Sequence, residues 1–309
     1  MPEVLGLGPA LLARARKDAE VWLAGSVTSG PAVLLGAVQR AGAVVDMAAC
    51  GRQGVGVYRR ATTGTAAWAG GRVLVWTLAL PHVAALAPDA TARTVLNRNV
   101  RGFLQGLTRA GALAQYYGRE WVSVRRRPAA LLGLEWSSDG AVLIEVVAGW
   151  DVPVALPAAV ASEREKATER WRDKAPLALV EVVGERTPAD VVRTVMDTVA
   201  TRAGFPLEWA SGGVAVDLPA AVTQAEDPVP RGLTLGPAVK VPVGWIEAAS
   251  GRGPEDRRAW IGGDVLTGTE ALAALCRGAA WGDAALEGAL PEDLARALVH
   301  AHDRANGRA

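Results

Sequence analysis

Hydrophobic and polar positions alternate along much of the chain, in short runs separated by Gly and Pro. A period of two predicts β-strands, whereas apolar positions that recur every three or four residues predict helices. One helix is predicted to open at Pro88 and Asp89 and to end near Gly111, because its apolar side chains share one face. The strands predicted around this helix cover 20–26, 54–60, 72–80, 121–124, 129–136 and 141–149.

The second half of the chain continues with mixed elements. The stretch SSDG (137–140) has the composition of a hairpin turn, and a charged helix is predicted over 156–173. A strand is predicted over 177–183. A helix then begins at Thr187, with a capping hydroxyl followed by a proline and an acid, and runs to about Gly204.

Residues 217–242 contain five prolines and little periodicity, which indicates a linker or an irregular wrap. Two strands around a turn follow, and then helices from about 269 and 291. This order predicts an α+β protein: a large mixed-sheet domain of residues 1–238, and a small C-terminal α/β accessory domain of residues 239–309.

Charge and cysteine content narrow the function classes. With 33 basic and 32 acidic residues the net charge is +1, so neither nucleic acid nor an acidic membrane is an expected partner. The apolar run at 73–80 ends at Pro81 and is too short to span a bilayer. Cys50 and Cys276 make no disulfide framework, and three histidines are too few for a histidine-rich metal centre, so we expect a cytoplasmic protein without a metal cluster.

The stretch RRATTGTAAW (59–68) carries the first candidate chemistry. Paired guanidinium groups match anionic oxygens, and a turn of small residues lets backbone N–H groups approach an anion. We therefore interpret Arg59 and Arg60 as the rim of an anion-binding pocket.

Three stretches, in this order, resemble the lipoate–protein ligase family within the biotin/lipoate ligase superfamily. They are VYRRATTGTAAW (57–68), YYGREWVSVRRRPAALLG (116–133) and the segment 244–278, which contains GGD and a helix ending in Arg-Gly. The residues that fall on the family pattern are Arg59, Arg60, Thr62, Gly64, Ala66, Gly118 and Arg119.

The resemblance implies a fold and an activity. The implied fold is a mixed sheet with helices, followed by an accessory domain. The implied activity uses ATP and Mg²⁺ to activate lipoate or a medium-chain fatty acid as an acyl-adenylate, and then passes the acyl group to a lysine of a lipoyl domain of a dehydrogenase complex or a similar carrier protein. Transferase relatives take the acyl group from a carrier. The implied substrate-binding residues are Arg59, Arg60, Thr62, Thr63, Gly64, Thr65, Ala66, Gly118 and Arg119.

The chain departs from the family pattern at several of these positions. The place of the family's lysine falls on Arg127 or Pro128, and we take Arg127 as the catalytic candidate because proline carries no charge. The glycine triplet is reduced to residues 63–65, where threonines flank one glycine. The Asn-Asp pair after Gly-Arg is replaced by Glu120 and Trp121. Losing several charge-stabilising groups from one site would slow adenylation strongly.

Three functions remain open at this point. The chain is an acyl ligase or transferase with an altered site, or a non-catalytic ligase-fold subunit that docks a lipoyl domain or a partner enzyme, or a ligase-fold protein that acts on an unrelated amine or acid. Lys174 is a further candidate cation. We interpret residues 125–127 as either a solvated basic face or a ligand clamp, and Asp264 as an acid that holds a turn.

Overall fold

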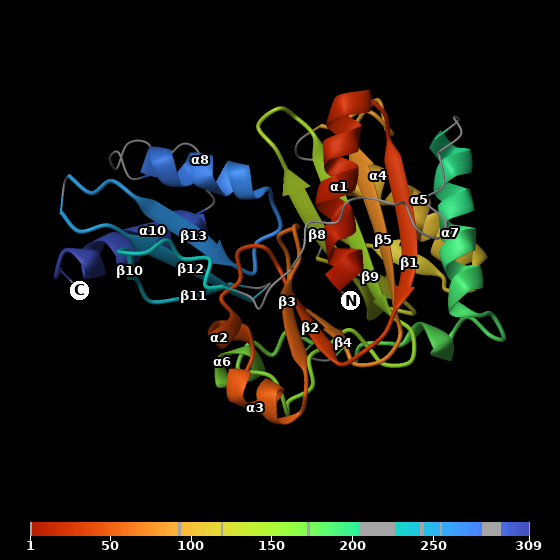
Figure 1. Cartoon of the computed structure of the whole chain (residues 1–309), viewed down its shortest axis with the longest axis horizontal. Helices are drawn as coiled ribbons and strands as arrows, with labels where there is room; N and C mark the ends of the chain where they lie inside the picture. The colour runs from red at the N-terminus through yellow and green to blue at the C-terminus, as the bar shows by residue number, and fades with distance from the viewer. Residues whose placement is uncertain are drawn as a thin grey trace.

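The main body is built on a six-stranded antiparallel sheet with the strand order β1-β5-β9-β8-β7-β6 (Figure 1). We describe a computed structural model, which covers residues 2–91, 94–118, 120–171, 174–203, 226–241, 244–253, 255–279 and 292–308. The six strands are β1 (Trp22–Thr28), β5 (Val73–Leu80), β6 (Ala114–Tyr116), β7 (Trp121–Val124), β8 (Arg127–Trp136) and β9 (Val142–Gly149).

The two central strands explain the apolar runs in the sequence. Every residue of β5 and β9 is buried, because both faces of the sheet are covered. Their register pairs Trp76 with Val146 and Leu78 with Ile144, so that bulky side chains stack on the same face. A continuous hydrophobic run is the pattern expected of a strand that is buried on both sides.

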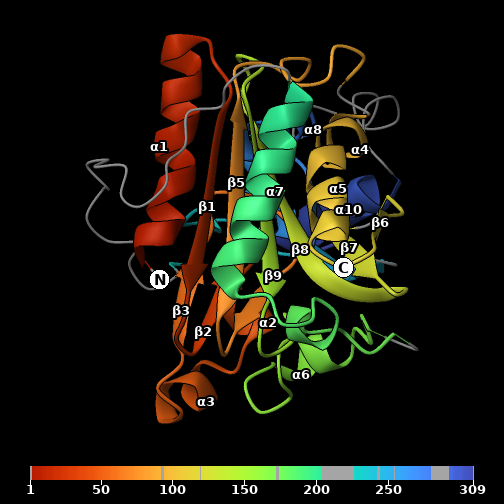
Figure 2. The same ribbon diagram turned by 90° about the vertical axis from the view of Figure 1, so that its right-hand side faces the viewer.

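Helices cover one face of this sheet (Figure 2). They are α4 (Val95–Asn99), α5 (Arg101–Arg109) and α7 (Pro188–Ala203). The helices α5 and α7 approach closely through glycine: a Cβ atom on Gly106 would lie 2.6 Å from the Cα of Val195. Phe103 and Leu107 of α5 are fully buried against the sheet.

The opposite face is covered by α1 (Pro2–Asp18) and by a three-stranded sheet of order β3-β2-β4 (Figure 1). Leu11 and Ala15 of α1 are fully buried above β1 and β5. The other elements on this side are β2 (Ala32–Leu35), α2 (Ala41–Val44), α3 (Met47–Arg52), β3 (Gly56–Arg59) and β4 (Ala67–Ala69). The turn between β3 and β4 contains most of the predicted site residues.

A smaller C-terminal unit packs beside the main body. Its central strand β12 pairs with the three other strands of its sheet. These elements are β10 (Thr234–Leu235), β11 (Val239–Val241), β12 (Gly244–Ser250), β13 (Ala259–Gly263), α8 (Thr269–Ala279) and α10 (Glu292–Ala305). Val38 of the main body joins the apolar core of this unit, so the two parts share buried surface.

The structure confirms the α+β class and most of the predicted strands, and it corrects three elements. The helix predicted to open at Pro88 begins only at Val95, and it is divided into α4 and α5. The charged helix predicted over 156–173 is wrong, since α6 covers only Glu163–Lys166 and Glu169 has a positive φ of 49°. The strand predicted over 177–183 is wrong as well, because the short 3-10 helix η1 (Leu179–Glu181) takes its place.

Several elements were not predicted, and some predictions fall outside the described residues. The helix α1 and the short strands β2, β4 and β6 gave no clear pattern. Of the proline-rich segment, 217–225 lie outside the described residues, whereas β10 and β11 form further along. The domain boundary after residue 238 stays a prediction. In the described part of the chain no helix is both long and apolar enough to cross a membrane.

The close contact between α5 and α7 leads to a stability prediction. We expect Gly106→Ala to lower the free energy of unfolding by about 1–3 kcal/mol, because the added methyl group would push against the backbone of α7. The matched control is Gly51→Ala in α3, where a Cβ atom would meet nothing within 4 Å. There the gain in helix propensity should stabilise by about 0.5–1 kcal/mol. Urea unfolding of both variants tests this, and equal effects would contradict the packing explanation.

Candidate functional site

The turn between β3 and β4, residues 61–66, is bonded directly to the main sheet. The backbone N–H of Thr63 donates to Leu134 O over 2.9 Å, and the N–H of Leu134 donates back to Thr63 O over 3.2 Å. The hydroxyl of Thr63 lies within hydrogen-bond distance of Leu134 O and Thr267 O, and it accepts from the N–H of Thr267 at 2.9 Å. The turn therefore connects β8 to the C-terminal unit.

One glycine in this turn is required by its conformation. Gly64 has a φ of 118°, and a Cβ atom there would lie 2.7 Å from Leu132 O. Neither Thr63 nor Thr65 has a positive φ. A glycine triplet is therefore not needed for this turn to form, and threonine fits both flanking positions. Ala66 is buried in the apolar cluster below the small sheet.

Arg60 points into the protein and is only 2 % exposed. Its Nη2 donates to Thr65 O over 2.8 Å, while its Nε and Nη1 have no hydrogen-bond partner among the described residues. Burial lowers the pKa of Arg60, and the attraction of Glu145 opposes this shift. The hydroxyl of Thr62 donates to the carboxylate of Glu145, which lies on β9.

The guanidinium group of Arg59 has different partners, because it donates hydrogen bonds to backbone carbonyl groups. Its Nη1 lies 2.9 Å from Gly36 O, 3.0 Å from Ala37 O and 2.7 Å from Gln39 O. Its Nη2 donates to Glu226 O over 2.8 Å. Arg59 thus holds the turn after β2, and the two arginines that are adjacent in sequence do not converge on one place.

Arg127 is also engaged by the chain itself. Its Nε donates to Ala175 O at 2.8 Å, its Nη2 donates to Pro176 O at 2.9 Å, and its Nη1 pairs with Glu181 at 2.9 Å. These contacts hold the segment before η1 against the start of β8. Arg125 and Arg126 form an exposed two-residue turn with positive φ values of 51° and 62°. The catalytic assignment of Arg127 stays a prediction.

A different arginine, which the sequence patterns did not single out, lies at the centre of the charged groups. The side chain of Arg170 is 2 % exposed and contacts acids from three parts of the chain. The distances are 3.0 Å to Asp264, 3.2 Å to Glu165 and 3.7 Å to Glu120. Its Nη1 also donates to the hydroxyl of Thr65 at 3.1 Å.

Electrostatics in this cluster follow from burial and charge. Burial lowers the pKa of Arg170, but Asp264 and Glu165 outweigh this effect and raise it above its ordinary value. Burial raises the pKa of Glu165, with Arg170 opposing the shift and Asp264 adding to it. Asp264 also accepts from Gln39 Nε2 at 2.6 Å and from the N–H of Trp245 at 2.8 Å, so it holds a turn as predicted and joins the two parts of the protein.

The second family-like stretch, residues 116–133, adds only a buried acid to the cluster around Arg170. Gly118 is exposed with a φ of 72°, and Arg119 lies outside the described residues. Glu120 is buried beside Arg170. The indole of Trp121 packs against Trp171, with ring centroids 5.7 Å apart.

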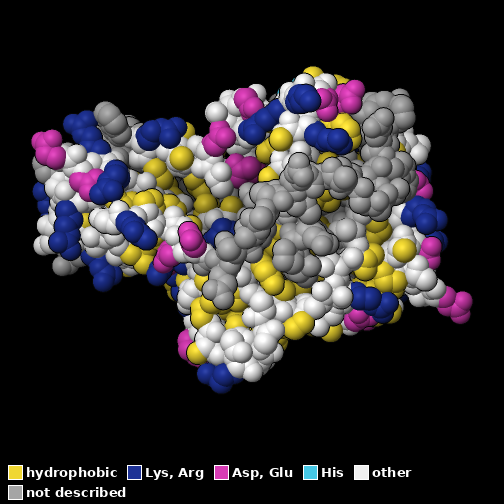
Figure 3. Space-filling model, in the orientation of Figure 1, with side chains coloured by type: hydrophobic (Ala, Val, Ile, Leu, Met, Phe, Trp, Pro, Cys, Tyr) yellow, Lys and Arg dark blue, Asp and Glu magenta, His cyan; other side chains and the backbone are white. Residues whose placement is uncertain are grey.

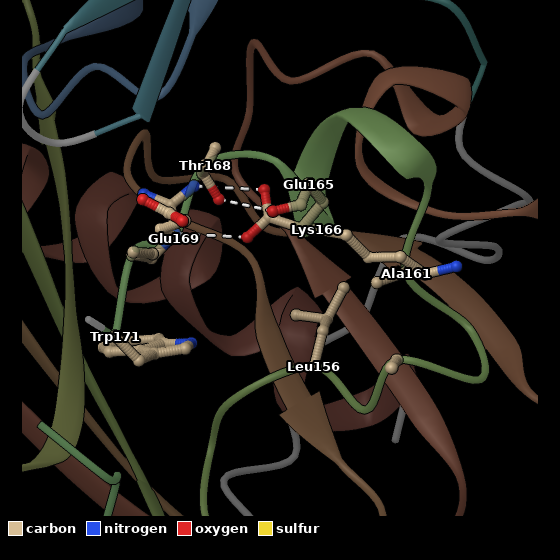
Figure 4. Close-up of a pocket in the computed structure, with 9 residues that line it drawn as sticks. Leu156, Ala161, Glu165, Lys166, Thr168, Glu169 and Trp171 are labelled. Carbon is tan, nitrogen blue, oxygen red and sulfur yellow. Dashed lines mark hydrogen bonds and ion pairs between the residues drawn. The ribbon is translucent and has the colours of Figure 1, made fainter. Parts of the chain in front are cut away.

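A cavity of about 430 Å³ lies next to this cluster. Figure 4 shows Trp171 and Leu156 on one side of it and Glu165 on the other, with Lys166 extending away. Its lining residues are Leu156, Ala158, Ala161, Glu165, Lys166, Thr168, Glu169, Arg170 and Trp171. Its size and mixture of apolar and charged groups are typical of small-molecule sites. No short motif marked it in the sequence, because its residues lie in an irregular segment.

Basic and acidic side chains are interspersed on the surface that Figure 3 shows over the C-terminal unit. In the C-terminal unit Arg258 pairs with Asp256 at 2.8 Å, and the buried Glu247 pairs with Arg40 of the main body at 3.2 Å. Both cysteines are free and buried.

Comparisons with known proteins identify the fold. No protein-family description and no curated protein matches the sequence. Among solved structures, P. falciparum LipL1 in complex with lipoate is 11 % identical with a TM-score of 0.68, over 90 % of this chain and 85 % of that chain. A bipartite lipoate protein ligase of Thermoplasma acidophilum, described with its E2 lipoyl domain, is 16 % identical with a TM-score of 0.56, over 68 % of this chain and 82 % of that chain. Lipoate-protein ligase A bound with ATP is 13 % identical with a TM-score of 0.55, over 68 % of this chain and 83 % of that chain. The chain has the fold of these lipoate–protein ligases.

The buried arginine cluster predicts a large loss of stability when its cation is removed. We expect Arg170→Met to cost about 3–5 kcal/mol of unfolding free energy, because buried acids are left without their partner. The control is Arg72→Met, which breaks an exposed pair with Asp151 and should cost much less, because water screens such a pair. Denaturant unfolding measures both, and a loss at position 170 no larger than that of the control would contradict this role.

Because Glu145 is buried, we expect the free energy of unfolding to depend on pH in a definite direction. Burial raises the pKa of Glu145, and Arg60 and Thr62 oppose the shift. A carboxyl whose pKa is raised on folding stabilises fully below the ordinary glutamate pKa, and that stability is lost as the pH rises through the raised value. We therefore expect stability to fall less steeply with rising pH in Glu145→Gln than in the wild type, across this window. Urea unfolding at several pH values checks this, with the exposed Glu163→Gln as a control that should leave the slope unchanged.

Proposed function

We propose that this protein is a ligase-fold subunit that binds an acyl-bearing carrier protein, such as a lipoyl domain, without forming an acyl-adenylate. One observation carries the proposal: Arg59 and Arg127, two of the cations that the family resemblance assigns to the site, are engaged inside the molecule. Arg59 donates hydrogen bonds to four backbone carbonyl groups, and Arg127 donates to two carbonyl groups and pairs with Glu181. Arg60 lies next to the buried acid Glu145.

Adenylation needs donors that are not already bonded to other groups when charge develops. Charge stabilisation in such reactions comes from groups already aimed at the reacting oxygens, and removing one typically costs a few kcal/mol of barrier. A guanidinium whose N–H groups are bonded to carbonyl oxygens must break these bonds before it can hold a phosphate. Positions 59 and 127 would both face this cost.

The residues after Gly118 do not fit a magnesium nucleotide. The carboxylate of Glu120 is buried beside Arg170, and Trp121 is packed against Trp171. Mg²⁺ prefers oxygen ligands that leave room for its water molecules. Glu120 and Trp121 therefore do not fit the magnesium nucleotide that adenylation would need.

The carrier class is supported by the solved structures of similar fold. One is described with its E2 lipoyl domain, another with bound lipoic acid and a third with lipoate. We propose a lipoyl domain or a similar carrier as the partner, and a lipoyl or medium-chain acyl group as the moiety recognised. A cytoplasmic location is part of this proposal, since lipoyl carriers belong to metabolic complexes and both cysteines are free.

An active acyl ligase or transferase is the second candidate, with ATP and Mg²⁺ as its cofactors if it forms an adenylate. Two observations favour it: Arg60 keeps two unpartnered N–H groups, and a cavity of about 430 Å³ lies beside Arg170. In this candidate Arg127 takes the place of the family's lysine, and it would first have to leave Glu181.

One experiment separates the two candidates. The protein is incubated with ATP, Mg²⁺, octanoate or lipoate, and a lipoyl domain. We expect no pyrophosphate and no mass added to the domain, together with binding of the domain by calorimetry, because the scaffold persists while its cations are occupied. The control is Arg127→Ala, which should bind the domain as the wild type does. Turnover that is lost in Arg127→Ala would establish the second candidate, and absence of both turnover and binding would also contradict the proposal.

A further inference from the structure

The guanidinium group of Arg60 has unused hydrogen-bonding capacity in the interior of the protein. It is 2 % exposed, one of its nitrogens donates to Thr65 O, and Nε and Nη1 have no partner among the described residues. A buried donor without an acceptor is costly, so such groups usually receive a protein, water or ligand oxygen.

Glu145 supplies the charge that balances this arginine. Its side chain is 2 % exposed, and it is the acid whose attraction acts on Arg60. One carboxylate oxygen accepts from Thr62, and the other lies near α1, where a Cβ atom on Gly8 would come within 3.3 Å of it. Because arginine keeps its proton in proteins, the buried pair is close to neutral when Glu145 is ionised.

Strand β8 leaves room for the guanidinium group of Arg60 because it has a glycine, Gly133, at this position. A Cβ atom on Gly133 would lie 2.7 Å from Arg60 Nη1 and 2.1 Å from the hydroxyl of Thr62. The pair therefore rests directly on the backbone of β8 at Gly133, which is the residue that pairs with Glu145 in the sheet. The N–H groups and the hydroxyl come from residues 60–62, the counter-ion from β9, and the glycine from β8.

We propose that the free N–H groups of Arg60 receive a neutral acyl carbonyl oxygen, that of an amide or a thioester, and that Glu145 excludes free carboxylates and acyl phosphates from this position. The proposal rests on the proposed function, because an acylated carrier presents such a carbonyl, whereas a ligase binds the free acid and the adenylate.

Charge decides between the two ligand classes. A carboxylate beside Arg60 would place a second buried anion next to Glu145, and two carboxylates that share one site cannot both ionise easily. A carbonyl oxygen accepts the same hydrogen bonds without adding charge, and it removes the cost of the unpaired donors. Glu145 is thus a specificity-determining residue.

The test compares a neutral and an anionic probe of the same chain length. Octanamide and octanoate are titrated into the full chain by calorimetry at mildly alkaline pH, with wild type, Glu145→Gln and the exposed control Glu163→Gln. We expect wild type and control to bind octanamide at least about tenfold more tightly than octanoate. In Glu145→Gln the ratio of the octanamide affinity to the octanoate affinity should fall by at least about tenfold, since Arg60 has lost its counter-ion.

The outcomes are distinguishable. Equal affinities in the wild type, or a ratio that Glu145→Gln leaves unchanged, would overturn the inference. Binding of neither probe by the wild type would also overturn it, and would indicate that a resident water serves Arg60. Melting curves show whether Glu145→Gln is folded. If it is not, the double variant Arg60→Met/Glu145→Met removes the donors together with the counter-ion and must weaken the binding of octanamide by at least about tenfold. Turnover in the ligase assay would contradict the proposed function, and it would leave the ratio of octanamide to octanoate affinity unaffected. If the protein binds the carrier but does not prefer octanamide to octanoate, only the inference drawn from Arg60 is contradicted.

Discussion

The buried guanidinium of Arg170 is the contact on which the arrangement of the whole molecule depends. It joins Glu165 of its own segment, Glu120 before β7 and Asp264 of the C-terminal unit, and it reaches Thr65 in the turn after β3. A buried cation with several acids is stable only while all partners stay in place. The C-terminal unit, the irregular segment and the turn are therefore positioned together, and the cavity beside Trp171 is a consequence of that packing.

The same principle governs the other cations of the ligase-like motifs. A scaffold of this fold can keep its shape while its arginines change partners, because a guanidinium holds carbonyl oxygens as readily as it holds an anionic ligand. Arg59 stabilises the turn after β2, and Arg127 stabilises the approach to η1. Arg60 differs from both, because it faces an acid and keeps donors to spare. The chemistry that remains in this region is consequently that of hydrogen bonding to a neutral group.

The sequence predicted the regular parts of the fold well where burial and periodicity agree. The strands β5, β8 and β9 were found from their apolar runs, and α7 from its capping residues. The prediction over 156–173 failed because a charged stretch was interpreted as a helix, whereas Glu165 and Arg170 are buried in an ion cluster. The run at 177–183 packs Leu177 and Leu179 under the sheet in a turn, so its apolar character reflects burial and not an extended backbone.

The sequence by itself determined the fold class, the order of the main elements, and the positions of the turn around Gly64 and of the motif residues. These depend on local propensity and on which side chains avoid water, and both are visible along a single chain. Only the tertiary structure decided which charges meet. Arg59 and Arg60 are neighbours in sequence but contact different parts of the chain, while Arg170 and Asp264 are distant in sequence and in direct contact. Partners of this kind are chosen by long-range packing and by the need to compensate buried charge.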